Sequence, residues 1–120
     1  MKFGKDKPIY IQIKQLIENK IIEKEWEEKE QIPSVRKFAK ELGVNPNTVM
    51  KSIKELQEDG MLKKIRGVGN KITRGSRKEL LNKRKKKFYR KDISVIIKKA
   101  KLLDITQNQL IDELKQRWDE

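Results

Sequence analysis

The chain has 120 residues, enough for one small domain and an appendage but not for a large additional ligand-binding domain. It contains neither cysteine nor histidine, which excludes disulfides, thiol nucleophiles, imidazole bases and ordinary zinc sites, so we expect no catalytic residue, metal or cofactor. The formal net charge of +13 indicates a polyanionic partner, and the lack of a long apolar run or a secretory pattern predicts a cytoplasmic protein without a membrane segment.

The first expected element is a helix that begins near Pro8, since proline suits the first helical turn. Its apolar residues repeat at steps of three and four and form one broad face: Ile9, Ile13, Leu16, Ile17 and Ile21. An acidic connection over residues 23–31 follows, and Trp26 is its only apolar anchor. We therefore expect Trp26 to pack against this first helix, which belongs to the core.

Residues 32–60 have the pattern of two short helices joined by one tight turn. Ser34 can cap the first helix, and Phe38 and Leu42 provide an apolar pair at i, i+4 spacing. Gly43 can adopt the positive φ angle that often follows a helix end. This arrangement predicts a helix-turn-helix, a geometry typical of DNA-binding proteins.

The second helix of this pair is expected over residues 46–59. Asn45 can cap it, and Pro46 suits its first position because the amide there has no helical partner. Its apolar stripe consists of Val49, Ile53 and Leu56. Its remaining face consists of Asn47, Thr48, Met50, Lys51 and Lys54. These side chains are polar, flexible or basic, which favours a groove-reading recognition helix over an ordinary helical hairpin with a glycine turn.

After Gly60 the pattern becomes typical of short strands. Apolar and β-favouring residues stand on both sides of the segment 66–69: Met61, Leu62 and Ile65 before it, Ile72 and Thr73 after it. This predicts a two-stranded hairpin, a wing beside the recognition helix. Arg66 would lie at the wing tip, where glycines let the backbone approach a phosphate or the minor groove closely. A plain surface turn is the alternative interpretation.

The excess positive charge is concentrated in one part of the chain. Between Lys63 and Lys91 there are fourteen Lys and Arg residues and one acid, Glu79, whereas the remainder is balanced. Such a block is typical of a surface that binds a polyanion, because each neutralised phosphate releases counterions. The candidate phosphate contacts are Lys54, Lys64, Lys71 and Lys85. A merely solvated face is the alternative for residues 83–87, since these side chains surround the whole helix.

The chain after the wing predicts two more helices. The first, over residues 76–103, has few apolar residues in its first half and many in its second. A break near Asp104 precedes the last helix, which Thr106 can cap together with Gln109 in a capping box. Because two helices cannot bury apolar faces of this size on each other alone, we expect residues 76–120 to form a homodimer. A helical cap folded back on the first domain is the competing interpretation.

Five stretches of the chain resemble the GntR family of bacterial repressors, and the short region after the wing looks most like the small YtrA subfamily. The stretches are Pro8–Ile13, Ile32–Arg36, Gly43–Val49, Asp59–Gly60 and Arg66–Gly69. We thus expect a mainly α fold with a small β-hairpin, in which a winged helix-turn-helix DNA-binding domain over residues 1–75 precedes a two-helix dimerisation or effector region over residues 76–120. The resemblance implies a homodimer that binds a palindromic operator in double-stranded DNA and represses transcription, often with release by a small effector.

The same resemblance implies roles for individual residues. Ser34 and Arg36 match positions of the second helix that contact the phosphate backbone and neighbouring bases. The groove-facing start of the recognition helix is matched by Asn45, Asn47, Thr48 and Lys51. Arg66 and Gly67 match the wing tip. These roles agree with chemistry, since Asn can pair twice with adenine, and Arg twice with guanine or a phosphate.

The base preference does not follow from the resemblance. Many relatives carry arginine on the recognition helix, where this chain has Pro46 or Met50. A contact between Met50 and a thymine methyl group is one option. A nucleic-acid-binding module of another kind, such as a plasmid or phage replication protein or an RNA binder, stays open as the alternative function.

Overall fold

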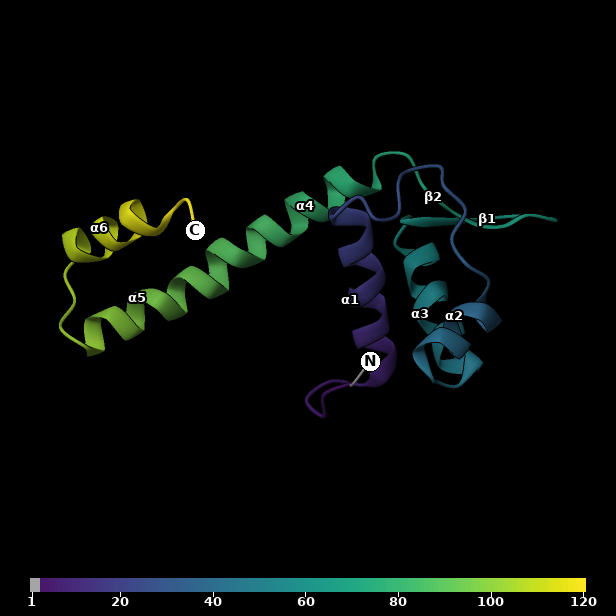
Figure 1. The fold of residues 1–120 in the computed structure, drawn as a ribbon, viewed down its shortest axis with the longest axis horizontal. Helices are drawn as coiled ribbons and strands as arrows, with labels where there is room; N and C mark the ends of the chain where they lie inside the picture. The colour runs from purple at the N-terminus through teal and green to yellow at the C-terminus, as the bar shows by residue number, and fades with distance from the viewer. Residues whose placement is uncertain (1–2) are drawn as a thin grey trace. The chain divides into compact units, whose positions relative to one another are not determined.

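The structure, a computed structural model, describes residues 3–120 as helices and one hairpin (Figure 1). The elements are α1 (Ile9–Ile22), α2 (Val35–Leu42), α3 (Pro46–Glu58), β1 (Leu62–Ile65), β2 (Gly69–Ile72), α4 (Ser76–Lys87), the π-helical η1 (Phe88–Asp92), α5 (Ile93–Leu102) and α6 (Gln107–Arg117). They form two compact units, one that extends to Leu81 and one that begins at Asn82. The expected fold, a winged helix-turn-helix followed by helices, is confirmed.

Local capping explains the boundaries of α2 and α3. The Ser34 hydroxyl accepts a hydrogen bond from the Lys37 amide at 3.2 Å, which caps α2. Gly43 ends this helix with a φ of 68°, a left-handed conformation that glycine adopts without steric cost. The Asn45 side-chain oxygen then accepts from the Asn47 amide at 2.8 Å and caps α3. The predicted helix-turn-helix is therefore present with both predicted caps.

The first unit is built around one hydrophobic core to which every element up to the start of α4 contributes. Its buried side chains are Ile13, Ile17, Ile21, Ile32, Phe38, Ala39, Val49, Ile53, Leu56, Met61, Leu62, Ile72 and Leu80. Trp26 lies at the edge of this core, with its ring centroid 5.5 Å from that of Phe38 in α2. Lys20 of α1 places its ammonium 5.3 Å from the Trp26 ring. Trp26 thus contacts the first helix, as expected, and also α2, which the pattern did not indicate.

The wing is an antiparallel hairpin in which Leu62 pairs with Ile72 and Ile65 with Gly69. The segment before α2 pairs with the outer edge of β2, a contact that the sequence pattern did not predict. The Lys29 amide donates to the Ile72 carbonyl at 2.7 Å, and the Ile72 amide donates to the Glu30 carbonyl at 3.0 Å. The Ile32 amide, directly before α2, donates to the Asn70 carbonyl at 3.0 Å. The wing is therefore joined by backbone hydrogen bonds to the chain that leads into α2.

The first half of α4 belongs to the first unit. The Ser76 hydroxyl donates to the Met61 carbonyl at 3.0 Å and to the Thr73 carbonyl at 2.6 Å, and Ser76 and Leu80 are both buried. Further along, the predicted helix 76–103 is interrupted by the π-helical turn Phe88–Asp92, which the apolar pattern did not reveal.

The second unit contains the predicted break and the predicted last helix. Asp104, with a φ of 57°, lies in the predicted break, and the capping box of Thr106 and Gln109 is present. In the single chain, Ala100 is the only buried residue among the apolar residues of positions 93–103. Among the described residues, no helix combines the length and the apolar character that crossing a membrane requires.

Candidate nucleic-acid interface

The outer face of α3 carries the residues that the sequence indicated for DNA binding. A helix turns by about 100° per residue, so the buried residues Val49, Ile53 and Leu56 mark one side of α3. The opposite side presents Asn47, Met50, Lys51 and Lys54, and all four are exposed. Thr48 is half-buried. We call the exposed surface of these four residues the reading face.

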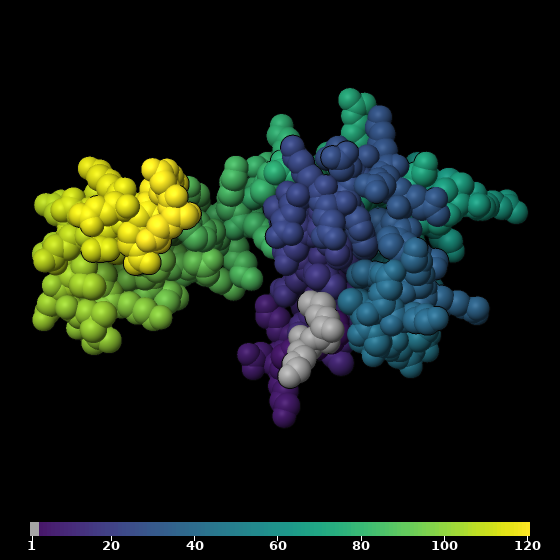
Figure 2. All heavy atoms as spheres, in the orientation of Figure 1, coloured from purple at the N-terminus to yellow at the C-terminus, as the bar shows by residue number. Residues whose placement is uncertain are grey.

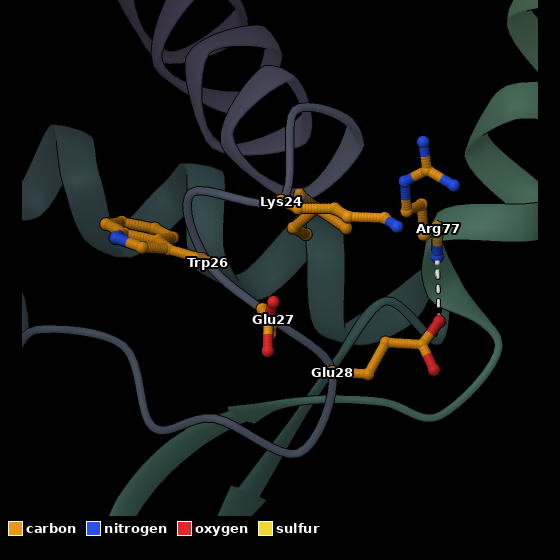
Figure 3. A pocket seen from close by; sticks show the side chains of 6 residues that line it. Lys24, Trp26, Glu27, Glu28 and Arg77 are labelled. Carbon is orange, nitrogen blue, oxygen red and sulfur yellow. Dashed lines mark hydrogen bonds between the residues drawn. The ribbon is translucent and has the colours of Figure 1, made fainter.

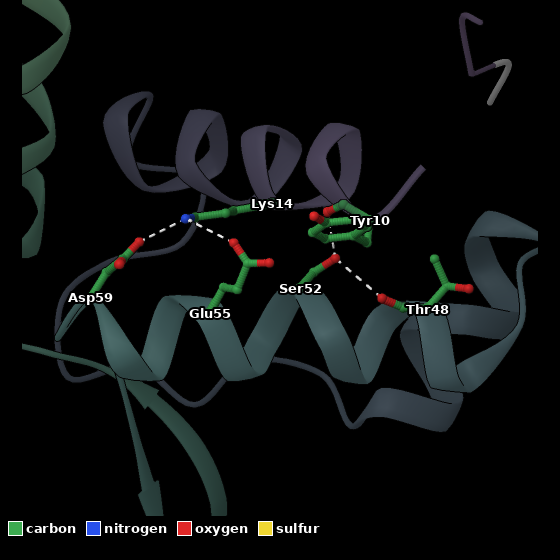
Figure 4. Close-up of polar contacts among 6 residues, drawn as sticks. All are labelled: Tyr10, Lys14, Thr48, Ser52, Glu55 and Asp59. Carbon is green, nitrogen blue, oxygen red and sulfur yellow. Dashed lines mark hydrogen bonds and ion pairs between the residues drawn. The ribbon is translucent and has the colours of Figure 1, made fainter. Parts of the chain in front are cut away.

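Polar contacts near both ends of α3 hold it against α1 (Figure 4). The fully buried Ser52 hydroxyl donates to the Tyr10 carbonyl of α1 at 2.6 Å and to the Thr48 carbonyl at 3.2 Å. At the other end of α3, the Lys14 ammonium lies 2.7 Å from an Asp59 carboxylate oxygen and 3.5 Å from Glu55. These contacts fix the rotation of α3 about its own axis, and with it the direction of the reading face.

The environment of Lys14 favours its charged form. Burial lowers the pKa of Lys14, but the hydrogen bond and charge of Asp59, with the charges of Glu18 and Glu55, outweigh this effect. The pKa of Lys14 therefore lies above its usual value near 10.5, so the link between α1 and α3 is charged at neutral pH.

Lys51 has a partner within the chain. Its ammonium lies 3.8 Å from the centroid of the Tyr10 ring, within the range of a cation–π contact (Figure 4 shows Tyr10 above α3). Tyr10 thus contacts α3 twice, through its carbonyl and through its ring. The sequence pattern identified Lys51 but not Tyr10, because the two residues belong to helices far apart in the chain.

The beginnings of α2 and α3 form one open hollow. It is lined by Ser34, Val35, Arg36, Pro46, Asn47 and Met50. The structure therefore brings together three of the predicted site residues, namely Ser34, Arg36 and Asn47. Within residues 3–120 the side chains of Arg36 and Asn47 make no hydrogen bond or ion pair, so their donors face solvent. Asn45 uses its side-chain oxygen for the cap of α3.

The predicted wing residues lie at and near the exposed turn of the hairpin, which projects from the first unit (Figure 2). Arg66 and Gly67 form the turn and are exposed, and Lys64 is exposed on β1. Lys71 on β2 is half-buried beside Gln31. Lys85 belongs to α4 in the second unit and is exposed.

Two side chains, one from α3 and one from the segment before α2, also hold the wing through contacts that sequence analysis missed. The Gln57 amide of α3 donates to the Asn70 side-chain oxygen of β2 at 2.6 Å. The side-chain amide of Gln31, in the segment before α2, donates to the Val68 carbonyl at the wing tip. Both contacts join residues that are distant in sequence, and only the hydrogen-bonding capacity of the side chains could have suggested them.

Known proteins match both the sequence and the fold of this chain. The profile of the Bacterial regulatory proteins, gntR family, matches residues 9–72. An uncharacterized regulator of the helix-turn-helix type from Bacillus subtilis, YhcF, is 31% identical over 114 residues, which cover 95% of this chain and 93% of YhcF. The chain belongs to the GntR family. It is accordingly a DNA-binding transcriptional regulator, as the sequence predicted.

Other regulatory proteins match part of the chain or most of it. The transcriptional repressor YtrA of B. subtilis is 35% identical over 62% of this chain and 57% of YtrA, which confirms the resemblance to YtrA. A GntR family regulator from Listeria monocytogenes aligns with a TM-score of 0.73 at 28% identity and covers 95% of this chain and 98% of that one. The DNA-binding domain of AraR in complex with an operator aligns with a TM-score of 0.56 at 25% identity, over 60% of this chain and 93% of that one.

A second hollow in this GntR chain lies beside the start of α4 (Figure 3). It is lined by Ile21, Lys24, Trp26, Glu27, Glu28 and Arg77. The Arg77 side chain donates to the Ile22 carbonyl at the end of α1 at 2.9 Å, and its amide donates to a Glu28 carboxylate oxygen at 3.3 Å. One cation of the basic block therefore joins α4 to α1 within the first unit, a role that charge counting did not reveal.

Proposed function

We propose that this GntR chain is a repressor that binds a palindromic operator as a homodimer, with α3 in the major groove and the wing tip 66–69 at the minor groove or the backbone. The observation that carries the proposal is the surface formed by the first turns of α2 and α3. Arg36 and Asn47 line one hollow there, and their hydrogen-bonding groups face solvent. Arginine can bind guanine or a phosphate through two donors, and asparagine can pair twice with adenine.

The proposal assigns two kinds of contact. Contacts that position or read the operator are assigned to Ser34, Arg36, Asn45, Asn47, Thr48, Lys51, Arg66 and Gly67. Phosphate contacts are assigned to Lys54, Lys64, Lys71 and Lys85. The operator complex of the AraR domain supports the general mode of binding, and the likeness to the repressor YtrA supports repression. An operator is reached where the chromosome lies, so a cytoplasmic location is part of the proposal.

The homodimer is proposed to form through residues 76–120, the region that would also hold any small effector. Large apolar side chains of this region are exposed in the single chain: Phe88, Tyr89, Val95, Ile96, Ile97, Leu102, Leu103, Ile105, Ile111, Leu114 and Trp118. An apolar surface of this extent is typical of a protein interface. A twofold dimer would bury it and would present two reading faces to the two halves of a palindrome.

The deciding experiment is selection of bound duplexes from a random pool, followed by footprinting of the enriched sequence. We expect a palindromic motif whose two half-sites lie about one helical turn apart. Sedimentation of the free protein should give the mass of a dimer. Equal affinity for all duplexes would contradict the repressor function, and a monomer that still protects both half-sites separately would contradict the dimer.

A further inference from the structure

Met50 is the residue of the reading face for which the proposed function has no role. It lies on α3, one turn after Asn47, and 52% of its surface is exposed. Within residues 3–81 the other exposed large apolar side chains are Ile9, at the start of α1, and Val68, in the wing. Met50 thus places a large apolar group among polar side chains, on the surface that is proposed to meet DNA.

The position of Met50 on α3 directs it toward α2. With about 100° per residue, Met50 and Lys51 lie on opposite flanks of the reading face, and Asn47 lies between them. Lys51 is on the α1 flank, where its ammonium contacts Tyr10. Met50 is on the α2 flank, where it lines the hollow together with residues from the first turn of α2. The two flanks therefore offer different chemistry, one cationic and one apolar.

The hollow around Met50 has an apolar part and a polar border. Val35 and Pro46 supply further apolar surface, and the polar groups come from Ser34, Arg36 and Asn47. A base edge that carries hydrogen-bonding groups would have no partner for them on this apolar surface, which costs free energy. The hollow therefore suits an apolar group of a base that stands beside hydrogen-bonding groups.

We propose that Met50 binds the 5-methyl group of a thymine in the major groove, with Val35 and Pro46 completing the apolar surroundings. The thymine methyl is the apolar feature that distinguishes the base pairs in this groove. The thioether side chain is flexible and polarisable, so it can follow the position of a methyl group. This inference rests on the proposed function, since it requires α3 to lie in the major groove.

The test removes the methyl group and leaves the hydrogen-bonding groups of the base unchanged. Each thymine of the selected operator is replaced in turn by deoxyuridine, symmetrically in both half-sites, and the dissociation constant is measured by fluorescence anisotropy. For the unmodified protein, deoxyuridine at one of the thymine positions should weaken binding by about fourfold per half-site, the factor that corresponds to burial of one methyl group. Replacement in both half-sites should weaken binding by about fifteenfold.

The same pair of operators is then bound by variants. Met50→Ala and Met50→Gln should bind the thymine and deoxyuridine operators equally, whereas Met50→Leu should retain most of the difference. Ile9→Ala is the matched control, because it shortens an exposed apolar side chain away from the hollow and should retain the full difference. Circular dichroism establishes whether each variant is folded. If Met50→Ala is unfolded, Met50→Gln is used as the test variant in its place.

Two results would overturn the inference while the proposed function stands: an operator in which no thymine methyl affects binding, or a methyl effect that persists in Met50→Ala and Met50→Gln. A pool without any enriched motif would overturn the proposed function and this inference together.

Discussion

The contact between Tyr10 and Lys51 should contribute measurably to the stability of the first unit. The Lys51 ammonium lies 3.8 Å from the ring centroid, and Lys51 is exposed while Tyr10 is half-buried. A cation–π contact at an exposed site contributes about 0.5–1 kcal/mol. In a double-mutant cycle with Tyr10→Leu and Lys51→Met, the coupling free energy of unfolding should therefore be about 0.5–1 kcal/mol. Tyr10→Phe keeps the ring and should retain most of the coupling.

The assay needs a probe of the first unit alone. Trp26 packs on Phe38 at the edge of the core, so its fluorescence follows the unfolding of this unit in urea. Trp118 in the second unit is replaced by Phe in every variant, and the protein concentration is held constant. In NMR spectra of the folded protein, the protons beside the Lys51 nitrogen should be shifted by the ring current of Tyr10. A coupling free energy of zero, with a Lys51 shift unchanged in Tyr10→Leu, would refute the contact.

Three other predictions concern the candidate interface and the ion pairs that hold α3 against α1. Asn47→Ala should reduce the preference for the operator in gel-shift competition, and an unchanged preference would remove Asn47 from base recognition. Replacement of Lys85–Lys87 by Gln should weaken binding to all duplexes and lower the salt slope by about 0.9 for each lost phosphate contact, whereas an unchanged slope would mean a solvated face. Because the folded-state pKa of Lys14 is raised, its stabilising effect is complete below pH 10.5 and is lost as the pH rises through the folded-state pKa. Urea unfolding at a series of pH values measures this effect. The difference in unfolding free energy between the parent chain and Lys14→Met should decrease as the pH rises through the folded-state pKa, and a constant difference would contradict the ion pairs.

The features that sequence analysis predicted correctly depend on residues close together in the chain. The caps formed by Ser34 and Asn45 use amides two or three residues ahead, and the Thr106 capping box spans three residues. The turn at Gly43 depends on its own backbone angle. Such contacts depend only on residues that are near one another in the sequence, so the helix-turn-helix and the last helix could be located without a structure.

The features that sequence analysis missed join distant segments. The pairing of residues 29–32 with β2 and the bond from Gln57 to Asn70 depend on the packing of elements that local patterns do not position. The π-helical turn Phe88–Asp92 was missed for another reason, since apolar periodicity does not separate it from an α-helical turn. The roles of the individual charges were hidden as well, because only the structure shows that Arg77 contacts Ile22.

Two groups of polar residues in the first unit differ in their contacts, since one group holds α3 and the other faces solvent. Ser52 and Lys14 fasten α3 to α1, and Gln57 fastens it to the wing. Arg36 and Asn47 make no side-chain hydrogen bond or ion pair within residues 3–120. Because the first group sets the orientation of α3 without facing the hollow, its substitution should change the affinity for all operators together. Substitution in the second group should change which operator is preferred, since these side chains have their donors available for bases.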